Sequence, residues 1–172
     1  ILGIQVLNMI FVSFILVQLG LLGHDTAHNQ VFRSEKNRNF IGRMLWNLMI
    51  GVSMGDWDAT HSRHHDYPNQ IKKDPDLFVP VAFSQKQIEK SRPFVKKILS
   101  YQHIYFYMIM PFYYASSIFR TTRFLIRERK VFESLLVLAH FIAYFGMIYW
   151  SFGFWKGSLL LAIMILGTGA YM

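Results

Sequence analysis

The chain has 172 residues, of which 53% are hydrophobic, 17% are aromatic and only 16% are charged. Because typical globular proteins are about 25% charged, this composition indicates a membrane protein. The absence of cysteine excludes a disulfide scaffold, a thiolate-ligated zinc or iron–sulfur site, and a cysteine nucleophile. The sequence opens on Ile1 inside an apolar run, so we expect it to be a piece of a longer protein.

The net charge of +8 is carried by the middle of the chain. Between His24 and Lys130 lie 17 of the 18 Lys and Arg residues and nine of the ten acidic residues. A basic block between apolar segments is what the positive-inside rule predicts for the cytoplasmic portion of a membrane protein. A nucleic-acid-binding protein needs instead a basic face on a soluble domain, so we expect no nucleic-acid partner.

Three apolar runs predict transmembrane helices at about residues 1–23, 131–152 and 157–172. The first run reaches about 34 Å, enough for a hydrocarbon core about 30 Å thick. It lacks the basic n-region and small-residue cleavage site of a signal peptide. Trp155, Lys156 and Gly157 form the expected turn between the last two runs, of which the final one stops short of a full span.

Two further segments are expected to lie on the cytoplasmic surface of the membrane. Residues 98–119 are apolar, but basic residues flank them on both sides, and crossing would place one basic cluster outside. Residues 40–57 are too short to span comfortably and include Arg43 and Asn47. The sequence therefore predicts one partial all-α integral membrane domain over residues 1–172. Its region 24–130 is cytoplasmic, with interfacial helices that carry a histidine-rich metal site.

Five of the seven histidines form two boxes, His24-x-x-x-His28 and His61-x-x-His64-His65. On a helix, residues three or four apart share one face, so imidazoles at these spacings can close on one metal ion. Five imidazoles are more ligands than one closed tetrahedral zinc site holds, so they indicate more than one metal ion. Imidazole is a suitable ligand for iron, copper, nickel and zinc. The competing interpretation, polar anchors at a membrane interface, explains a single pair better than two boxes on one side.

Other polar residues receive structural interpretations. His103 lies in an aromatic run and His140 is alone in the middle of an apolar run, so both are expected to be hydrogen-bonded structural residues. Asp74 and Asp76 flank Pro75, which favours a turn or a helix entry over a metal pair.

The pattern Gly23-His24-Asp25-x-x-His28, then His61-x-x-His64-His65, Pro68-Asn69 and Asp74-Pro75-Asp76 resembles the membrane fatty-acid desaturases. The resemblance is closest to the front-end acyl desaturases, a group that includes sphingolipid enzymes. It implies a four-helix membrane fold with a cytoplasmic cap that holds two iron ions on three histidine boxes. The third box, HxxHH or QxxHH, is absent from these 172 residues. We therefore expect the fragment alone to be inactive.

The resemblance also implies the chemistry, an O2-dependent removal of two hydrogens from an acyl lipid or acyl thioester. Electrons come from a donor such as ferredoxin or a b-type cytochrome, and the host membrane is a bacterial inner membrane or the endoplasmic reticulum. The resemblance implies that the metal ligands are His24, His28, His61, His64 and His65. The residues Asp25, Asp58 and Asp66 are candidates to orient these imidazoles by hydrogen bonds.

Three other functions share some of these features. A membrane hydroxylase has the same ligands and differs in its product. A zinc-dependent hydrolase needs a general acid or base beside the ligands, and neither box contains a Glu. A bis-histidine haem carrier needs two histidines that face each other from different spans. Only His140 lies in the middle of an apolar run. One group of basic residues has two interpretations. It could bind an acidic electron donor or anionic lipid head groups, or it could be ordinary positive-inside charge. The residues are Lys72, Lys73, Lys86, Lys90 and Arg92.

Overall fold

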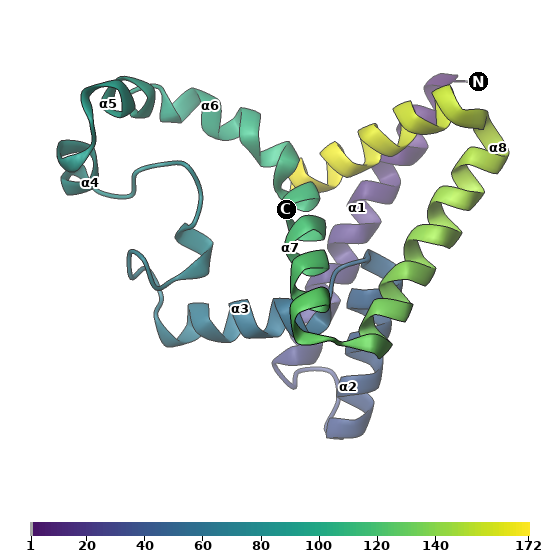
Figure 1. Ribbon diagram of the computed structural model, residues 1–172. Helices are drawn as coiled ribbons and strands as arrows, with labels where there is room; N and C mark the ends of the chain where they lie inside the picture. The colour runs from purple at the N-terminus through teal and green to yellow at the C-terminus, as the bar shows by residue number, and fades with distance from the viewer. Residues whose placement is uncertain (1) are drawn as a thin grey trace. The chain divides into compact units, whose positions relative to one another are not determined.

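The computed structural model describes residues 2–172, and all of its regular elements in that range are helical (Figure 1). This confirms the all-α prediction. In chain order the elements are α1 (Leu2–Ala27), α2 (Glu35–Arg43), the π-helix η1 (Met44–Ile50), α3 (Met54–Asp66), the 3₁₀ helix η2 (Pro75–Leu77), α4 (Gln85–Lys90), α5 (Pro93–Leu99), α6 (Gln102–Ile109), the 3₁₀ helix η3 (Met110–Phe112), α7 (Tyr113–Glu128) and α8 (Val131–Tyr171).

The chain forms two compact units. Unit 1 contains the residues up to Asp58 together with Pro111–Met172, and unit 2 contains Ala59–Met110. The first boundary falls inside α3 and the second inside η3.

The core of unit 1 lies between α1, η1, α7 and the two halves of α8. Its buried side chains include Met9 and Leu16 of α1, Trp46 of η1, and Leu160 and Met164 of α8. The hydroxyl of Ser13 in α1 donates to the backbone oxygen of Met164 at 3.0 Å, which joins α1 to the second half of α8.

α8 is two helices joined at Gly153, where the backbone has φ 70° and ψ 174°. Residues other than glycine rarely adopt a positive φ, so glycine permits this sharp reversal. Figure 1 shows the chain turning back at this point, so that the final segment runs beside α1. The turn was expected at residues 155–157. It comes earlier because Trp155 and Lys156 already belong to the helix that follows.

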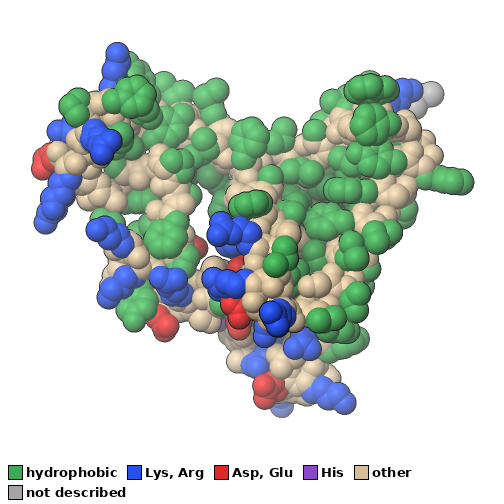
Figure 2. All heavy atoms as spheres, viewed as in Figure 1, with side chains coloured by type: hydrophobic (Ala, Val, Ile, Leu, Met, Phe, Trp, Pro, Cys, Tyr) green, Lys and Arg blue, Asp and Glu red, His purple; other side chains and the backbone are tan. Residues whose placement is uncertain are grey.

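Two helices, α1 and α8, are long and apolar enough to cross a membrane by length and composition. Both expose large apolar side chains, among them Ile4, Leu7, Leu135 and Ile142. In Figure 2, hydrophobic side chains cover much of the visible surface of these two helices. A surface of this kind is unfavourable in water and marks a place where an apolar partner covers the protein.

The segment 40–57 differs from the single surface helix that the sequence predicted. It divides into the end of α2, the π-helix η1, a short loop and the start of α3. Leu45, Trp46 and Ile50 of η1 are at most 5% exposed and pack into unit 1. Asn47, one of the polar residues that favoured a surface helix, is itself buried, and its side-chain oxygen accepts from the N–H of Met54 at 2.8 Å.

The segment 98–119 is also interrupted. α5 ends at Leu99, α6 runs from Gln102 to Ile109, and the 3₁₀ helix η3 follows before α7 begins. Pro111 lies in η3, where it removes a backbone hydrogen-bond donor. None of these pieces is among the helices of the described chain that are long and apolar enough to span a membrane.

Unit 2 is held together by side-chain contacts with the backbone. The side-chain amide of Gln102 forms two hydrogen bonds with the backbone of Ala82. It accepts from the N–H at 2.8 Å and donates to the carbonyl at 3.2 Å. The hydroxyl of Tyr105 donates to the carbonyl of Pro80 at 2.7 Å. These bonds connect α6 to the irregular segment that comes after α3.

Candidate metal centre

The first histidine box lies at the end of α1. The backbone N–H of His28 donates to the carbonyl of His24 at 3.1 Å, so the box keeps helical spacing although α1 ends at Ala27. The two imidazole rings lie 4.5 Å apart between centroids, and both residues are half-buried. The two side chains therefore lie on one face, as the spacing predicted.

His24 also contacts two neighbours in unit 1. Its Nδ1 lies 3.3 Å from a carboxylate oxygen of Asp25. The indole ring of Trp57 packs edge-on against its imidazole, with the centroids 5.9 Å apart, and stacks in turn on Trp46 at 4.5 Å. The aromatic contacts connect the first box to the π-helix and to the first turns of α3.

The second box lies within α3, in unit 2. The Nε2 atoms of His61 and His65 are 3.0 Å apart, and the ring centroids are separated by 4.6 Å. Two imidazole nitrogens bonded to one metal ion at about 2.1 Å each lie about 3 Å apart. His64 lies beside this pair, with its ring centroid 5.8 Å from that of His65.

His64 is held by two carboxylates. Its Nδ1 lies 2.9 Å from Asp74 Oδ1 and 3.2 Å from Asp76 Oδ2. The hydrogen bond with Asp74 is the main cause that raises the pKa of His64 above its ordinary value, and the charges of both aspartates add to it against a smaller effect of burial. The carboxylate fixes the orientation of the ring and leaves Nε2 available for a metal.

Asp74 is the buried hub of this loop, with a side chain only 1% exposed. Its carboxylate accepts hydrogen bonds from the N–H groups of Asn69 at 2.7 Å and Asp76 at 3.0 Å, besides its bond with His64. Burial alone would raise the pKa of Asp74, but His64 and the two N–H groups together hold it below its usual range. Asp74 also caps η2, which confirms the predicted helix-entry role.

The orienting role of Asp74 was missed in the sequence. The signal for it is the Asp74-Pro75-Asp76 run ten residues after His64, where an acidic cap follows a histidine box. Of the predicted orienting residues, Asp25 contacts His24, whereas Asp58 and Asp66 are exposed on α3.

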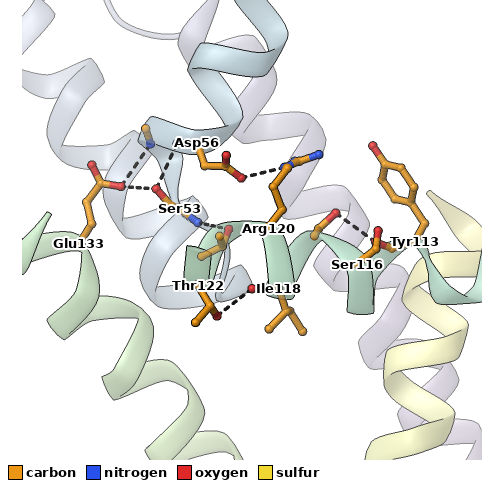
Figure 3. Close-up of polar contacts among 11 residues, drawn as sticks. Ser53, Asp56, Tyr113, Ser116, Ile118, Arg120, Thr122 and Glu133 are labelled. Atoms are coloured by element: carbon orange, nitrogen blue, oxygen red, sulfur yellow. Dashed lines mark hydrogen bonds and ion pairs between the residues drawn. The ribbon is translucent and has the colours of Figure 1, made fainter. Parts of the chain in front are cut away.

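The first turn of α3 is tied to α7 and α8 by a buried polar network (Figure 3). Ser53 caps the helix by accepting from the N–H of Asp56 at 3.1 Å, and its own hydroxyl donates to Glu133 Oε2 at 2.6 Å. The same oxygen accepts from the N–H of Gly55 at 3.2 Å, and the N–H of Ser53 donates to the hydroxyl of Thr121 at 3.0 Å. A carboxylate at a helix N-terminus is favourable, so Glu133 stabilises the start of the helix that carries the second box.

The remaining histidines differ from each other. His140 is buried in α8, its Nδ1 bonds to the carbonyl of Leu48 at 2.9 Å, and its ring stacks on Tyr144. This confirms a hydrogen-bonded structural role for His140. His103 is exposed on α6, and the described part of the chain offers it no such bond.

The donor set fits a transition metal. Within each box two imidazoles lie close enough to share an ion, and one ring of the second box is oriented by a carboxylate. Imidazole donors suit iron, copper, nickel and zinc. The fold and these boxes define an all-helical, histidine-box protein with two helices suited to a bilayer.

The family model described as "Fatty acid desaturase" matches residues 2–172. The chain belongs to the fatty acid desaturase family. It is 31% identical to a "Delta(8)-fatty-acid desaturase" of Euglena gracilis over 109 residues, which are 59% of this chain and 26% of that protein. It is 29% identical to an "Acyl-lipid (9-3)-desaturase" of Physcomitrium patens over 166 residues, 88% of this chain and 31% of that protein.

A second "Acyl-lipid (9-3)-desaturase", from Borago officinalis, is 33% identical over 115 residues, 57% of this chain and 25% of that protein. The chain spans about a third or less of the length of these curated relatives. No solved structure matches it significantly.

Proposed function

We propose that the protein to which this chain belongs is a membrane-embedded front-end fatty acyl desaturase with a histidine-ligated di-iron centre. The observation that carries this proposal is the pair of boxes, each with imidazoles in mutual contact, in a chain of the desaturase family. The relatives named as Delta(8) and (9-3) desaturases support the front-end assignment.

Insertion into a membrane is supported by the dimensions and surfaces of α1 and α8. At 1.5 Å per residue, α1 reaches about 39 Å, and the halves of α8 before and after Gly153 reach about 33 Å and 27 Å. These lengths are close to the hydrocarbon core of about 30 Å. The exposed Ile4, Leu7, Leu135 and Ile142 would face lipid. The excess of basic residues between α1 and α8 supports a cytoplasmic position for both boxes.

The metal ligands are His24 and His28 of the first box and His61, His64 and His65 of the second. Asp74 would hold His64 with Nε2 toward the metal, and Asp25 would restrain His24 in the same way. When bound, the two irons supply the oxidation, in which an acyl CH2–CH2 pair, O2, two electrons and two protons give CH=CH and two water molecules. The chain contributes the ligand geometry, and its apolar helices keep the acyl substrate within the membrane.

The two electrons come from an external donor such as ferredoxin or a b-type cytochrome. A surface in unit 2 is suited to an acidic donor, because its basic side chains are all exposed. These residues are Lys72, Lys73, Lys86, Lys90 and Arg92. Neutralising them in pairs would raise the donor concentration needed for half-maximal turnover without changing the product.

Product analysis tests the proposal. The reading frame that contains these residues is expressed in a host whose fatty acids lack front-end double bonds, and the lipids are analysed by gas chromatography and mass spectrometry. We expect a new unsaturated fatty acid that disappears in the His61→Ala and His65→Ala variants. A hydroxylated fatty acid would assign the chain to a hydroxylase instead. Activity that survives both substitutions would exclude the second box from the reaction.

A further inference from the structure

A cavity of about 520 Å³ lies on α7 in unit 1, and none of its lining residues belongs to a histidine box. Three arginines and three apolar residues dominate its lining, with one carboxylate among them. The lining residues are Asp56, Phe119, Arg120, Arg123, Phe124, Ile126 and Arg127. In Figure 2, Lys and Arg side chains gather over the segment that Figure 1 labels α7, with acidic side chains among them.

Each arginine of the cavity is held by a neighbour. Arg120 Nε donates to Asp56 Oδ2 at 2.8 Å, a contact that Figure 3 shows in full. The guanidinium of Arg123 lies 5.8 Å from the ring centre of Phe119. Arg127 Nε donates to Glu128 Oε1 at 2.8 Å. Because Asp56 is the only carboxylate that lines the cavity, the lining retains a net positive charge.

We propose that this cavity binds the phosphate of an anionic phospholipid headgroup. The planar guanidinium matches phosphate with two parallel hydrogen bonds, so arginines at positions 120, 123 and 127 of one helix form a suitable donor set. Their spacing of three and four residues places them on one face of α7.

The apolar residues of the cavity favour a lipid over a free anion. Phe119 is 64% exposed and Ile126 is 74% exposed, so an acyl chain would cover surface that water now meets. α7 ends at Glu128, and α8 begins at Val131, so the arginines lie directly before a proposed span, at headgroup depth. The inference rests on membrane insertion of α8 and not on desaturation.

The test measures lipid binding to the protein in an uncharged detergent by native mass spectrometry, which counts bound lipids. The probes are dihexanoyl phosphatidylglycerol, dihexanoyl phosphatidylcholine and inorganic phosphate. The test variant is Arg123→Gln with Arg127→Gln, which leaves the Arg120–Asp56 pair intact. The matched control is Arg33→Gln with Lys36→Gln, which removes two exposed charges outside the cavity. Circular dichroism confirms that each variant is folded.

We expect phosphatidylglycerol to bind about tenfold more weakly to the test variant, as the loss of charge-assisted hydrogen bonds predicts, and the control to be unchanged. Arg123→Lys with Arg127→Lys should also weaken binding, because lysine keeps the charge but loses the planar fork. Equal weakening in the control would overturn the proposal in favour of diffuse charge. Binding of phosphatidylcholine as tight as that of phosphatidylglycerol, or full competition by inorganic phosphate, would overturn the anionic lipid as the ligand.

Discussion

Asp74 and His64, ten residues apart, are joined by a contact of 2.9 Å between Asp74 Oδ1 and His64 Nδ1. The carboxylate is buried at the start of η2, where two backbone N–H groups also bind it. Its position is therefore set by the loop and not by the histidine. A carboxylate so fixed selects the ring orientation in which Nε2 is free for a metal.

Asp74→Asn should weaken metal binding by about 10- to 100-fold, the range seen when the partner of a ligating histidine is removed. Asn69 donates to Oδ2 and Asp76 to Oδ1, so the single amide oxygen of asparagine keeps only one of these two bonds. A melting curve of the variant therefore accompanies the metal titration, to separate loss of the loop from loss of the histidine's partner. A titration with Fe²⁺ under anaerobic conditions measures the change in affinity.

Asp66→Asn is the matched control for this prediction. Asp66 is exposed at the end of α3, two residues after His64, and it was also expected to orient an imidazole. We expect its replacement to change the affinity by less than about twofold, as for a solvated charge. If Asp66→Asn weakens binding as much as Asp74→Asn, the assigned role of Asp74 is wrong.

Glu133→Ala should destabilise unit 1 by about 2 kcal/mol, because the hydroxyl of Ser53 and the N–H of Gly55 would lose their acceptor in a buried site. Thermal unfolding in detergent measures the loss. Glu128→Ala is the control, since that glutamate is paired with Arg127 on an exposed part of α7 and should contribute less than about 1 kcal/mol. Equal melting temperatures for the two variants would show that the network at α3 is not stabilising.

Gly51→Ala should also be destabilising, by about 1–2 kcal/mol for the backbone alone. Gly51 has φ +79°, and an added Cβ would lie 2.6 Å from the imidazole of His140. Gly146→Ala in α8 makes the same chemical change in a helix with open space around it, and it should be neutral or stabilising. Comparison of the two melting temperatures separates the conformational effect from the added methyl group.

Removal of metal should lower the melting temperature of the protein, because a ligand that binds only the folded state stabilises it. At a free metal concentration 100 times the dissociation constant the stabilisation is about 2.7 kcal/mol. A chelator titration followed by circular dichroism measures it. The His61→Ala/His65→Ala variant should melt at the same temperature with and without the chelator, and a persistent difference would place the metal elsewhere.

The apolar runs and the box spacing were readable from the sequence because each is a local pattern. α1 and the two halves of α8 cover the predicted runs, and the pairs His24–His28 and His61–His65 meet as helical spacing requires. Periodicity and spacing of this kind involve residues within one or two turns.

The features that escaped prediction depend on long-range contacts or unusual backbone. Glu133 and Ser53 are hydrogen-bonded although they are 80 positions apart in the sequence, and no local pattern around either residue predicts the contact. The π-helix η1 breaks the period by which its buried side chains would be recognised. The reversal at Gly153 depends on a single positive φ, which the neighbouring Trp155 and Lys156 obscured.

We expect the two histidine boxes to bind iron. The most direct measurement is the metal content per chain of the protein purified anaerobically, by inductively coupled plasma mass spectrometry, beside His61→Ala, His65→Ala and the exposed His103→Ala. We expect iron in the unaltered protein and in His103→Ala, and its loss in His61→Ala and His65→Ala. Zinc in place of iron, or iron that survives both box substitutions, would contradict it.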